Sequence, residues 1–296
     1  MEYLTIYANA KINLTLDALY KRDDGYHEME MVMQTVELND VITIRKLFTN
    51  HIKLVSNIKW LPLDERNLVY RACKALMDEF NIDSGVYAEI EKQIPMSAGL
   101  GGGSADCAAA LVGMRKLFNL DVSNERLLEI GKSLGADVPY CLTRGTVLAK
   151  GIGEKLTRLN PCPQAYVVIV RPSLVISTGE VFAMYKPENI TKRPDTQAMI
   201  KAIDNDDIHG VANNLSNVLE SVTAKQFRII EDLKEALVDK GALGSVMSGS
   251  GPSVFGLFDS RDKAMAAVRY IRLVMPVREV YLTNIFNPGR NDFYER

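Results

Sequence analysis

The fold of this chain is decided by one glycine-rich stretch, Pro95-Met96-Ser97-Ala98-Gly99-Leu100-Gly101-Gly102-Gly103-Ser104. It lies between a predicted strand over residues 85–94 and a predicted alanine-rich helix that runs to about residue 117. Glycine allows backbone N–H groups to approach an oxyanion closely, and the unpaired N–H groups at a helix start add a partial positive charge. A tight turn needs only one or two glycines, and this stretch has four in five positions. It therefore predicts a phosphate-binding loop.

Two better-known phosphate loops do not fit this stretch. A Walker A loop ends in Gly-Lys-Ser or Gly-Lys-Thr, and no lysine precedes Ser104. A dinucleotide fingerprint has a third glycine where Ser104 stands, and an acid at a strand end about twenty residues later. Asp121 lies near that distance, but its surroundings predict a connection between two helices.

The first residues predict a strand with one polar face. Apolar side chains alternate with polar ones over residues 4–16, which is the two-residue period of a half-buried strand. The polar face carries Asn9, Lys11 and Asn13 in a row. Because side chains two apart stand roughly 6–7 Å apart, one small ligand can touch both Lys11 and Asn13. The alternative is a solvated face, which is the usual place of a lysine.

The composition narrows the class of protein. A length of 296 residues with 47% hydrophobic and 24% charged side chains predicts a globular protein of two domains. The net charge is −2, and Lys and Arg are spread along the chain, which argues against a nucleic-acid partner. No signal-peptide pattern and no bilayer-length apolar run occur, so we expect a cytoplasmic protein without a membrane partner. The four cysteines have neither CxxC spacing nor a zinc pattern and are expected to be reduced thiols.

A proline-rich segment over residues 160–163 is the predicted linker, which divides the chain into domains 1–160 and 161–296. The first part predicts strands over residues 32–36 and 41–44 and helices over 67–80 and 124–134. The second predicts a strand over 166–170, a helix over 225–240, strands over 245–247 and 253–258, a helix over 261–273 and a strand over 280–283. This is the ferredoxin-like order, with a polar insert of helix and loop after its first strand.

Several stretches together resemble the GHMP kinases, the superfamily of galactokinase, homoserine kinase, mevalonate kinase and phosphomevalonate kinase. The glycine-rich stretch resembles the phosphate motif of that superfamily, and Ser248-Gly249-Ser250-Gly251-Pro252 resembles its C-terminal motif. Three further motifs resemble those of the diphosphocytidyl-methylerythritol kinases in particular: Ala8-Asn9-Ala10-Lys11-Ile12-Asn13-Leu14, Asp24-Gly25-Tyr26-His27 and Gly135-Ala136-Asp137-Val138-Pro139-Tyr140. Ala105 and Tyr140 stand where many members carry Ser and Phe.

The resemblance implies a mixed α/β (α+β) fold of two domains, the first ribosomal-protein-S5-domain-2-like and the second ferredoxin-like. It also implies phosphorylation of a cytidyl diphosphate substrate by ATP in the cleft between them. Asp137 is implied as the base, and Lys11 beside it would keep the carboxylate ionised, because a neighbouring cation favours the charged form. The residues alone leave a second interpretation open, in which Asp137 caps a short helix at Val138-Pro139.

The remaining roles also follow from the resemblance. Tyr26 and Phe182 would stack on the cytosine and His27 would hydrogen-bond its edge, whereas Asn13 and Thr178 would bind the methylerythritol end. The residues implied for ATP are the glycine-rich stretch, its continuation Ala105, and two weaker candidates for the adenosine half, Asn67 and Lys92. Each of these two residues also has a purely structural interpretation, as a helix-cap residue or as a solvated strand side chain. Magnesium would accompany ATP, with Ser104 as its one protein ligand.

Two rival functions remain at this point. Another GHMP kinase, acting on homoserine, mevalonate or a sugar, would keep the loop but would have no use for a nucleobase clamp. A non-catalytic sensor on the same fold would not need both Lys11 and Asp137. The protein is expected to be a monomer or a weak homodimer.

Overall fold

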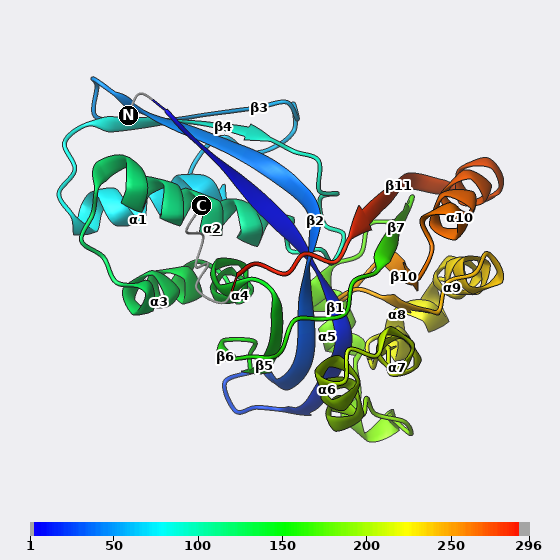
Figure 1. Ribbon diagram of the computed structural model, residues 1–296. Helices are drawn as coiled ribbons and strands as arrows, with labels where there is room; N and C mark the ends of the chain where they lie inside the picture. The colour runs from blue at the N-terminus through cyan, green and yellow to red at the C-terminus, as the bar shows by residue number, and fades with distance from the viewer. Residues whose placement is uncertain (1–2, 290–296) are drawn as a thin grey trace.

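The centre of the molecule is a long antiparallel pair of strands, β1 (Leu4–Lys21) and β2 (His27–Leu47). The computed structural model describes residues 3–289, and Figure 1 shows this pair running diagonally through the whole molecule. The sequence predicted two separate strands within β2. The structure joins them, because the polar residues between them remain extended opposite β1, at an irregularity in the pairing between Asn9 and Lys11.

The first sheet has seven strands, and one of them comes from the second half of the chain. Its order is β3-β4-β2-β1-β8, and β5 pairs with both β2 and β6. The strands not yet bounded are β3 (Ile52–Ser56), β4 (Gly85–Glu91), β5 (Thr146–Gly151), β6 (Lys155–Arg158) and β8 (Ser216–Asn217). The short strand β8 pairs in parallel with Thr15 and Leu16 of β1. The predicted boundary at residue 160 therefore does not separate the two sheets completely.

Three helices of the first half pack on this sheet: α1 (Leu68–Glu79), α2 (Gly102–Phe118) and α4 (Val138–Thr143). A further helix, α3 (Asn124–Leu134), packs against these three helices. Helix α2 is buried along most of its length, since its small alanine side chains allow close approach of β1, β2 and α1. Helix α3 has the predicted bounds, because Ser123 caps its first turn with a side-chain hydrogen bond to the Arg126 N–H.

The second sheet has the predicted ferredoxin-like topology. Its antiparallel strands β7 (Tyr166–Pro172), β9 (Gly244–Met247), β10 (Val254–Phe258) and β11 (Val277–Asn284) lie in the order β11-β7-β10-β9. Its helices are α8 (Glu220–Gln226), α9 (Ile229–Asp239) and α10 (Arg261–Val274). The insert after β7 forms α5 (Thr178–Met184), a 3₁₀ turn η1 (Pro187–Asn189), α6 (Thr196–Asp204) and α7 (Ile208–Asn213). The helix predicted over 225–240 is broken at Phe227, whose backbone is extended.

Strand β1 is buried more deeply than its alternating pattern predicted. Its outer residues Ile6 and Ala8 join the main core, whereas Ala10 and Ile12 join a second core that reaches β7 and β10. Between these apolar positions Lys11 is only 5% exposed and Asn13 is fully buried. The solvated polar face considered for this strand is therefore wrong from Lys11 onward, because the glycine-rich loop, Asp137 and the turn at Gly249 cover Lys11.

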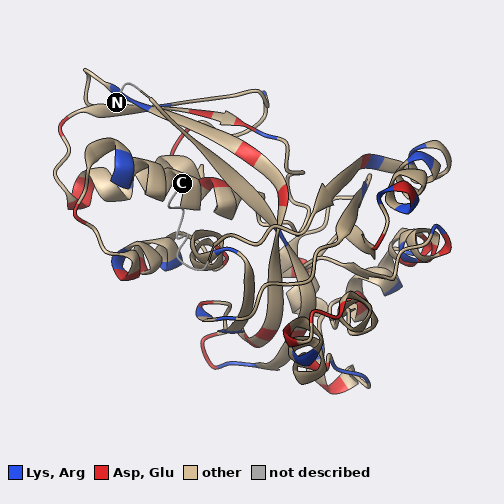
Figure 2. Ribbon diagram, in the orientation of Figure 1, with Lys and Arg blue, Asp and Glu red and all other residues tan. Residues whose placement is uncertain are grey.

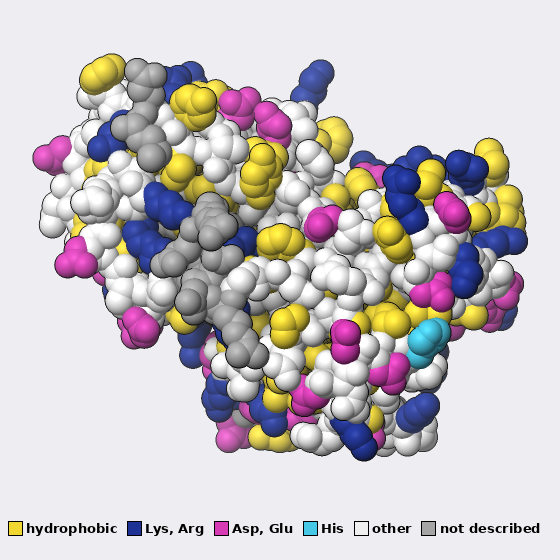
Figure 3. All heavy atoms as spheres, viewed as in Figure 1, with side chains coloured by type: hydrophobic (Ala, Val, Ile, Leu, Met, Phe, Trp, Pro, Cys, Tyr) yellow, Lys and Arg dark blue, Asp and Glu magenta, His cyan; other side chains and the backbone are white. Residues whose placement is uncertain are grey.

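The surface carries both signs of charge. Figure 2 shows Lys and Arg interspersed with Asp and Glu in both halves, and Figure 3 shows the same mixture on one face. Among residues 3–289, no helix combines the length and the apolar character that crossing a membrane requires. All four cysteines are free and buried.

Candidate active site

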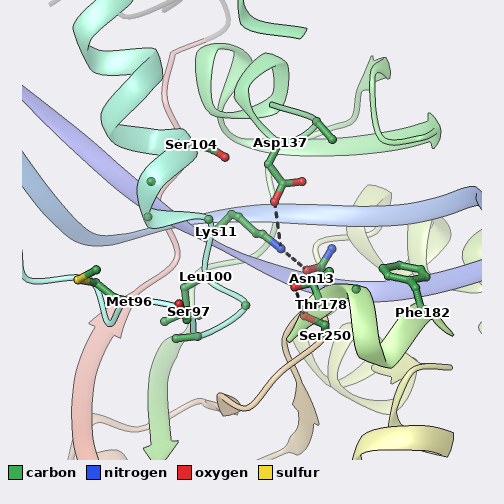
Figure 4. A pocket seen from close by; sticks show the side chains of 18 of the residues that line it. Lys11, Asn13, Met96, Ser97, Leu100, Ser104, Asp137, Thr178, Phe182 and Ser250 are labelled. Atoms are coloured by element: carbon green, nitrogen blue, oxygen red, sulfur yellow. Dashed lines mark hydrogen bonds and ion pairs between the residues drawn. The ribbon is translucent and has the colours of Figure 1, made fainter. Parts of the chain in front are cut away.

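A cleft of about 970 Å³ lies where the two sheets meet. Its lining includes every residue that the sequence predicted for catalysis, ATP or substrate, with the exception of Ala105. The side chain of Ala105 is fully buried in the main core, and its N–H bonds the Gly101 carbonyl within the helix. Figure 4 shows the cleft from close by, with Lys11 between Asp137 and Asn13.

The glycine-rich stretch has the backbone conformation that a phosphate loop needs. Ser97, Gly99 and Gly101 have positive φ angles of 51°, 74° and 70°, and α2 begins directly after Gly101. The N–H groups of Gly102, Gly103 and Ser104 therefore stand at a helix start without partners four residues back. A Cβ at Gly103 would meet only Leu68, at 3.9 Å, so this part of the loop is open. An anion fits here through backbone donors and the helix dipole.

The C-terminal motif holds the loop from the other side of the cleft. The Ser248 hydroxyl donates to the Gly99 carbonyl at 3.0 Å, and a Cβ at Gly99 would lie 2.1 Å from the Ser248 carbonyl oxygen. Asn217 in turn holds this motif, since its amide donates to the Met247 and Gly249 carbonyls, each at 2.8 Å. Sequence reasoning missed Asn217, because a single asparagine at the end of a polar insert carries no signal of this contact.

Lys11 and Asp137 meet at the centre of the cleft. The Lys11 ammonium donates to Asn13 Oδ1 at 2.7 Å and lies 3.9 Å from Asp137 Oδ2. The Lys11 backbone N–H also donates to the Leu100 carbonyl at 3.0 Å, which fixes β1 against the glycine-rich loop. The three polar side chains thus surround one point beside the helix start (Figure 4).

Asp137 precedes α4, but its side chain does not cap that helix within the described structure. Its carboxylate points toward Lys11 and stays partly accessible, with 37% of the side chain exposed. Pro139 in the first turn needs no capping acceptor, since it has no N–H. The position of Asp137 directly before α4 fits the capping interpretation, whereas the direction of its side chain fits the catalytic interpretation.

The nucleobase end of the cleft is built on a turn. Gly25 has a φ of 86°, and the Asp24 carboxylate accepts the Tyr26 N–H at 3.0 Å, so the 60% exposed Tyr26 ring is held at the cleft edge. The His27 ring packs on Phe182 with centroids 5.2 Å apart and meets the edge of Tyr185 at 5.7 Å. Burial and, secondly, the charge of Lys21 lower the pKa of His27, so its imidazole is neutral at neutral pH.

Thr178 and Ser250 close the cleft between the loop and α5. Their hydroxyls lie 2.8 Å apart, and Thr178 is the first residue of α5, which Ser177 caps. Asn13 reaches the same region, with its amide 3.5 Å from Met31 Sδ. Sequence reasoning quoted Ser250 within its motif without giving it a role, although the motif itself was the available signal.

The two adenosine candidates have structural partners. Asn67 is the N-cap of α1 and accepts the Val69 N–H at 2.9 Å, which is the structural role that the sequence offered as an alternative. Lys92 is not a solvated strand residue, because its ammonium is buried between the carboxylates of Asp40 and Asp106. Burial raises the pKa of Asp106, although the charge of Lys92 opposes that effect. Both Asn67 and Lys92 still line the cleft.

Family models match both halves of the chain. The GHMP kinases N terminal domain matches residues 67–145, which include the glycine-rich loop and Asp137, and the GHMP kinases C terminal matches residues 199–277. A homoserine kinase from Cytophaga hutchinsonii superposes with a TM-score of 0.76 over 96% of this chain and 95% of its own, at 20% identity. That likeness shows the fold alone.

Two closer relatives identify the branch of the superfamily. The 4-diphosphocytidyl-2-C-methyl-D-erythritol kinase of Clostridium novyi is 47% identical over 93% of this chain and 98% of its own. The crystal structure of a 4-(cytidine 5'-diphospho)-2C-methyl-D-erythritol kinase superposes with a TM-score of 0.83 over 97% of this chain and 100% of its own, at 28% identity. These findings confirm the predicted fold and the predicted resemblance: the chain belongs to the GHMP kinases and, among them, to the 4-diphosphocytidyl-2-C-methyl-D-erythritol kinase family.

Proposed function

We propose that this protein transfers the γ-phosphoryl group of ATP to the 2-hydroxyl of 4-diphosphocytidyl-2-C-methyl-D-erythritol, giving the 2-phosphate and ADP, a step of non-mevalonate isoprenoid biosynthesis. The observation that carries the proposal is the Lys11–Asp137 pair, 3.9 Å apart, beside the start of α2 and in one cleft with Tyr26, His27 and Phe182. Membership in the family supports the same substrate.

The chemistry follows from what each group can hold. The Asp137 carboxylate accepts the proton of the acceptor hydroxyl as its oxygen forms a bond to the γ-phosphorus and the bond from that phosphorus to the bridging oxygen of ADP breaks. The Lys11 ammonium, held by Asn13, places positive charge beside the reacting oxygens. The N–H groups at the start of α2 bind the phosphates without moving, which favours in-line transfer.

The acceptor is recognised at both of its ends. A cytosine entering between Tyr26 and Phe182 gains stacking worth roughly 1–3 kcal/mol. In that arrangement the neutral His27 ring moves away from Phe182, so that one of its nitrogens hydrogen-bonds the cytosine edge. Thr178 and Asn13 hold the methylerythritol hydroxyls. A homoserine, mevalonate or sugar kinase has no use for such an aromatic cluster, and a sensor does not require the Lys11–Asp137 pair.

In this cleft the protein would supply few of the ligands of a magnesium ion. Residues 3–289 contain no group of three or more His, Cys, Asp or Glu side chains that could hold a metal ion. The Ser104 hydroxyl stands in the first turn of α2, on the side of Gly135. It would be one ligand, with phosphate and water oxygens as the others, and the ion would neutralise charge on the phosphates.

The test is phosphorus NMR of the purified protein with Mg-ATP and the methylerythritol substrate. We expect a new phosphomonoester signal that grows with ADP, as the acceptor is consumed. ATP left unchanged with this acceptor, but consumed with homoserine, mevalonate or a sugar, would transfer the assignment to another GHMP kinase. The boundary at residue 160 and a monomeric or weakly dimeric state remain part of the proposal, to be checked by limited proteolysis and sedimentation.

A further inference from the structure

A second cavity, of about 360 Å³, lies beside the segment over residues 92–96 that leads into the glycine-rich loop. Asn57 fixes one of its walls, because its side chain accepts the Lys92 N–H at 2.8 Å and donates to the Lys92 carbonyl at 3.1 Å. Another wall comes from β7 and β11 of the second sheet. The cavity shares Lys92, Pro95 and Met96 with the active-site cleft, so the two spaces are neighbours.

The lining of this cavity carries more positive than negative charge. Arg171 and Arg278 contribute two guanidinium groups, and Glu279 is the only acid among the described residues that line the cavity. The two arginines share this one carboxylate, since Arg171 Nη1 lies 3.5 Å from Glu279 Oε2 and Arg278 Nε lies 3.9 Å from Glu279 Oε1. The Lys92 ammonium is already paired with two buried carboxylates. One positive charge of the arginine pair is therefore left without a counterion.

Arg171 is the more deeply placed of the two arginines. The residue is 5% exposed, and its Nε is buried without a hydrogen-bond partner in the part of the chain that the structure describes. A guanidinium removed from water is costly unless it is fully paired, and the single long contact with Glu279 offsets little of that cost. Nε lies too deep for a ligand, but an anion in the cavity would compensate the charge through the terminal nitrogens.

An irregularity in β11 brings Arg278 to the same cavity. Glu279 stands opposite Arg171 and Val277 opposite Pro172, with a shift in register between these two pairs. In a regular strand, residues 278 and 279 would point to opposite faces of the sheet. A bulge redirects a side chain, which explains how both of these neighbours line one cavity. The bulge thus adds a second guanidinium to the one from β7.

The size and the remaining lining of the cavity indicate the kind of ligand. A volume of about 360 Å³ is at the lower end of the range for small-molecule sites. The Trp60 ring is 68% exposed at one side and Tyr281 lies in the same lining, so a carbon skeleton has apolar surface to rest on. Guanidinium groups match the oxygens of phosphate in geometry as well as charge.

We propose that this cavity binds a small phosphorylated organic molecule, whose phosphate lies on Arg171 and Arg278 and whose carbon skeleton lies against Trp60. The site is additional to the active-site cleft and does not depend on the kinase assignment.

The test uses the fluorescence of Trp60, which is the only tryptophan of the chain and therefore reports on this cavity. The protein is first saturated with magnesium and a non-hydrolysable ATP analogue, so that the glycine-rich loop is occupied. It is then titrated with phenyl phosphate, and with phenol as the ligand that has the ring without the phosphate. We expect a saturable change with phenyl phosphate, with a dissociation constant of about 1 mM or below, and none with phenol.

Variants of the charged residues connect the signal to the cavity. Arg278→Met should weaken phenyl phosphate about tenfold or more, since a hydrogen bond between charged groups is lost, and its half-exposed side chain makes the change compatible with folding. Glu279→Gln should strengthen binding, because it removes the carboxylate that competes for both arginines. Arg228→Met is the control, at an 82% exposed side chain outside the cavity, and should bind as wild type does. Melting curves establish that each variant is folded.

Three outcomes would overturn the proposal: no saturable change in wild type, an equal response to phenol, or an unchanged affinity in Arg278→Met. A response that wild type shows alone but loses with the ATP analogue would place the phosphate in the active-site cleft, and would also overturn it. None of these results bears on phosphoryl transfer, which phosphorus NMR tests separately.

Discussion

At the scale of single residues, Asp137 and the groups around it carry the chemistry. Its carboxylate faces Lys11 and makes no cap to α4, so replacing it should disturb the reaction more than the fold. We expect Asp137→Asn to lower kcat by roughly 10²–10⁴-fold, the usual contribution of a general base, with the dissociation constant of ATP unchanged. Asp121→Asn, at an exposed position, is the control and should leave kcat unchanged. A wild-type kcat in Asp137→Asn would show that Asp137 is not the general base.

Tyr26 is the residue on which nucleobase recognition depends most directly. Its ring is 60% exposed at the cleft edge, so it contributes little to the core and is free to stack on a base. Tyr26→Ala should raise KM for the cytidyl substrate roughly 5–150-fold, as expected from the loss of 1–3 kcal/mol of stacking, with little change in KM for ATP. Tyr20→Ala removes a ring of similar exposure, 57%, that does not line the cleft. Equal increases in KM for the cytidyl substrate in Tyr26→Ala and Tyr20→Ala would show that the cytosine binds elsewhere.

At the scale of elements, the glycine-rich loop depends on the 248–251 turn. Gly99→Ala combines a positive φ with a Cβ only 2.1 Å from the Ser248 carbonyl, so the two segments must separate. We expect a loss of about 2–4 kcal/mol in the free energy of unfolding, measured by urea denaturation, together with weaker ATP binding. Gly103→Ala has no positive φ and nothing nearer than 3.9 Å, and should keep its stability. Comparable losses in both variants would contradict the packing argument.

Elements with a local signal were predictable from the sequence. The bounds of α3 follow from its capping residue, and the loop before α2 follows from its glycines. The hairpin of β5 and β6 and the strand β8 were missed, since short strands are defined by distant partners rather than by their own pattern. A continuous β2 was missed for the same reason, because pairing with β1 overrides its polar interruption.

The residues of the candidate site also divide into those that carry a signal in the sequence and those that do not. Lys11, Asp137 and the aromatic residues were found through motifs, and the structure brings all of them to one cleft. The burial of Lys92 could not be read from the sequence, because its partner Asp40 lies 52 positions away on another strand. The assigned roles themselves stay predictions until the variants are measured.

At the scale of the whole molecule, His27 lies where the two halves touch. Its ring packs on Phe182 and Tyr185 of the insert, and burial lowers its pKa below the ordinary 6.5. As pH falls below about 6.5, the unfolded chain therefore binds a proton that the folded protein resists, and the free energy of unfolding falls until the lowered pKa is passed.

Melting temperatures at pH 8 and pH 5.5 check this expectation against a His27→Gln variant. The difference between the two proteins at pH 8 measures the packing of the ring. That difference should shrink at pH 5.5, because only the wild type loses stability through this histidine. The same acid-induced decrease in both proteins would show that His27 does not report the change.

Strand β8 has a consequence for how substrates enter and products leave. It ties the second half of the chain to the edge of β1, and Asn217 at its end holds the 248–251 turn over the glycine-rich loop. A hinged separation of the halves at the floor of the cleft is thereby opposed, because such a motion would break either this parallel pairing or the amide contacts of Asn217. Passage of both substrates is left to the outer rim, where the turn bearing Tyr26 and the short helix α5 stand opposite the loop.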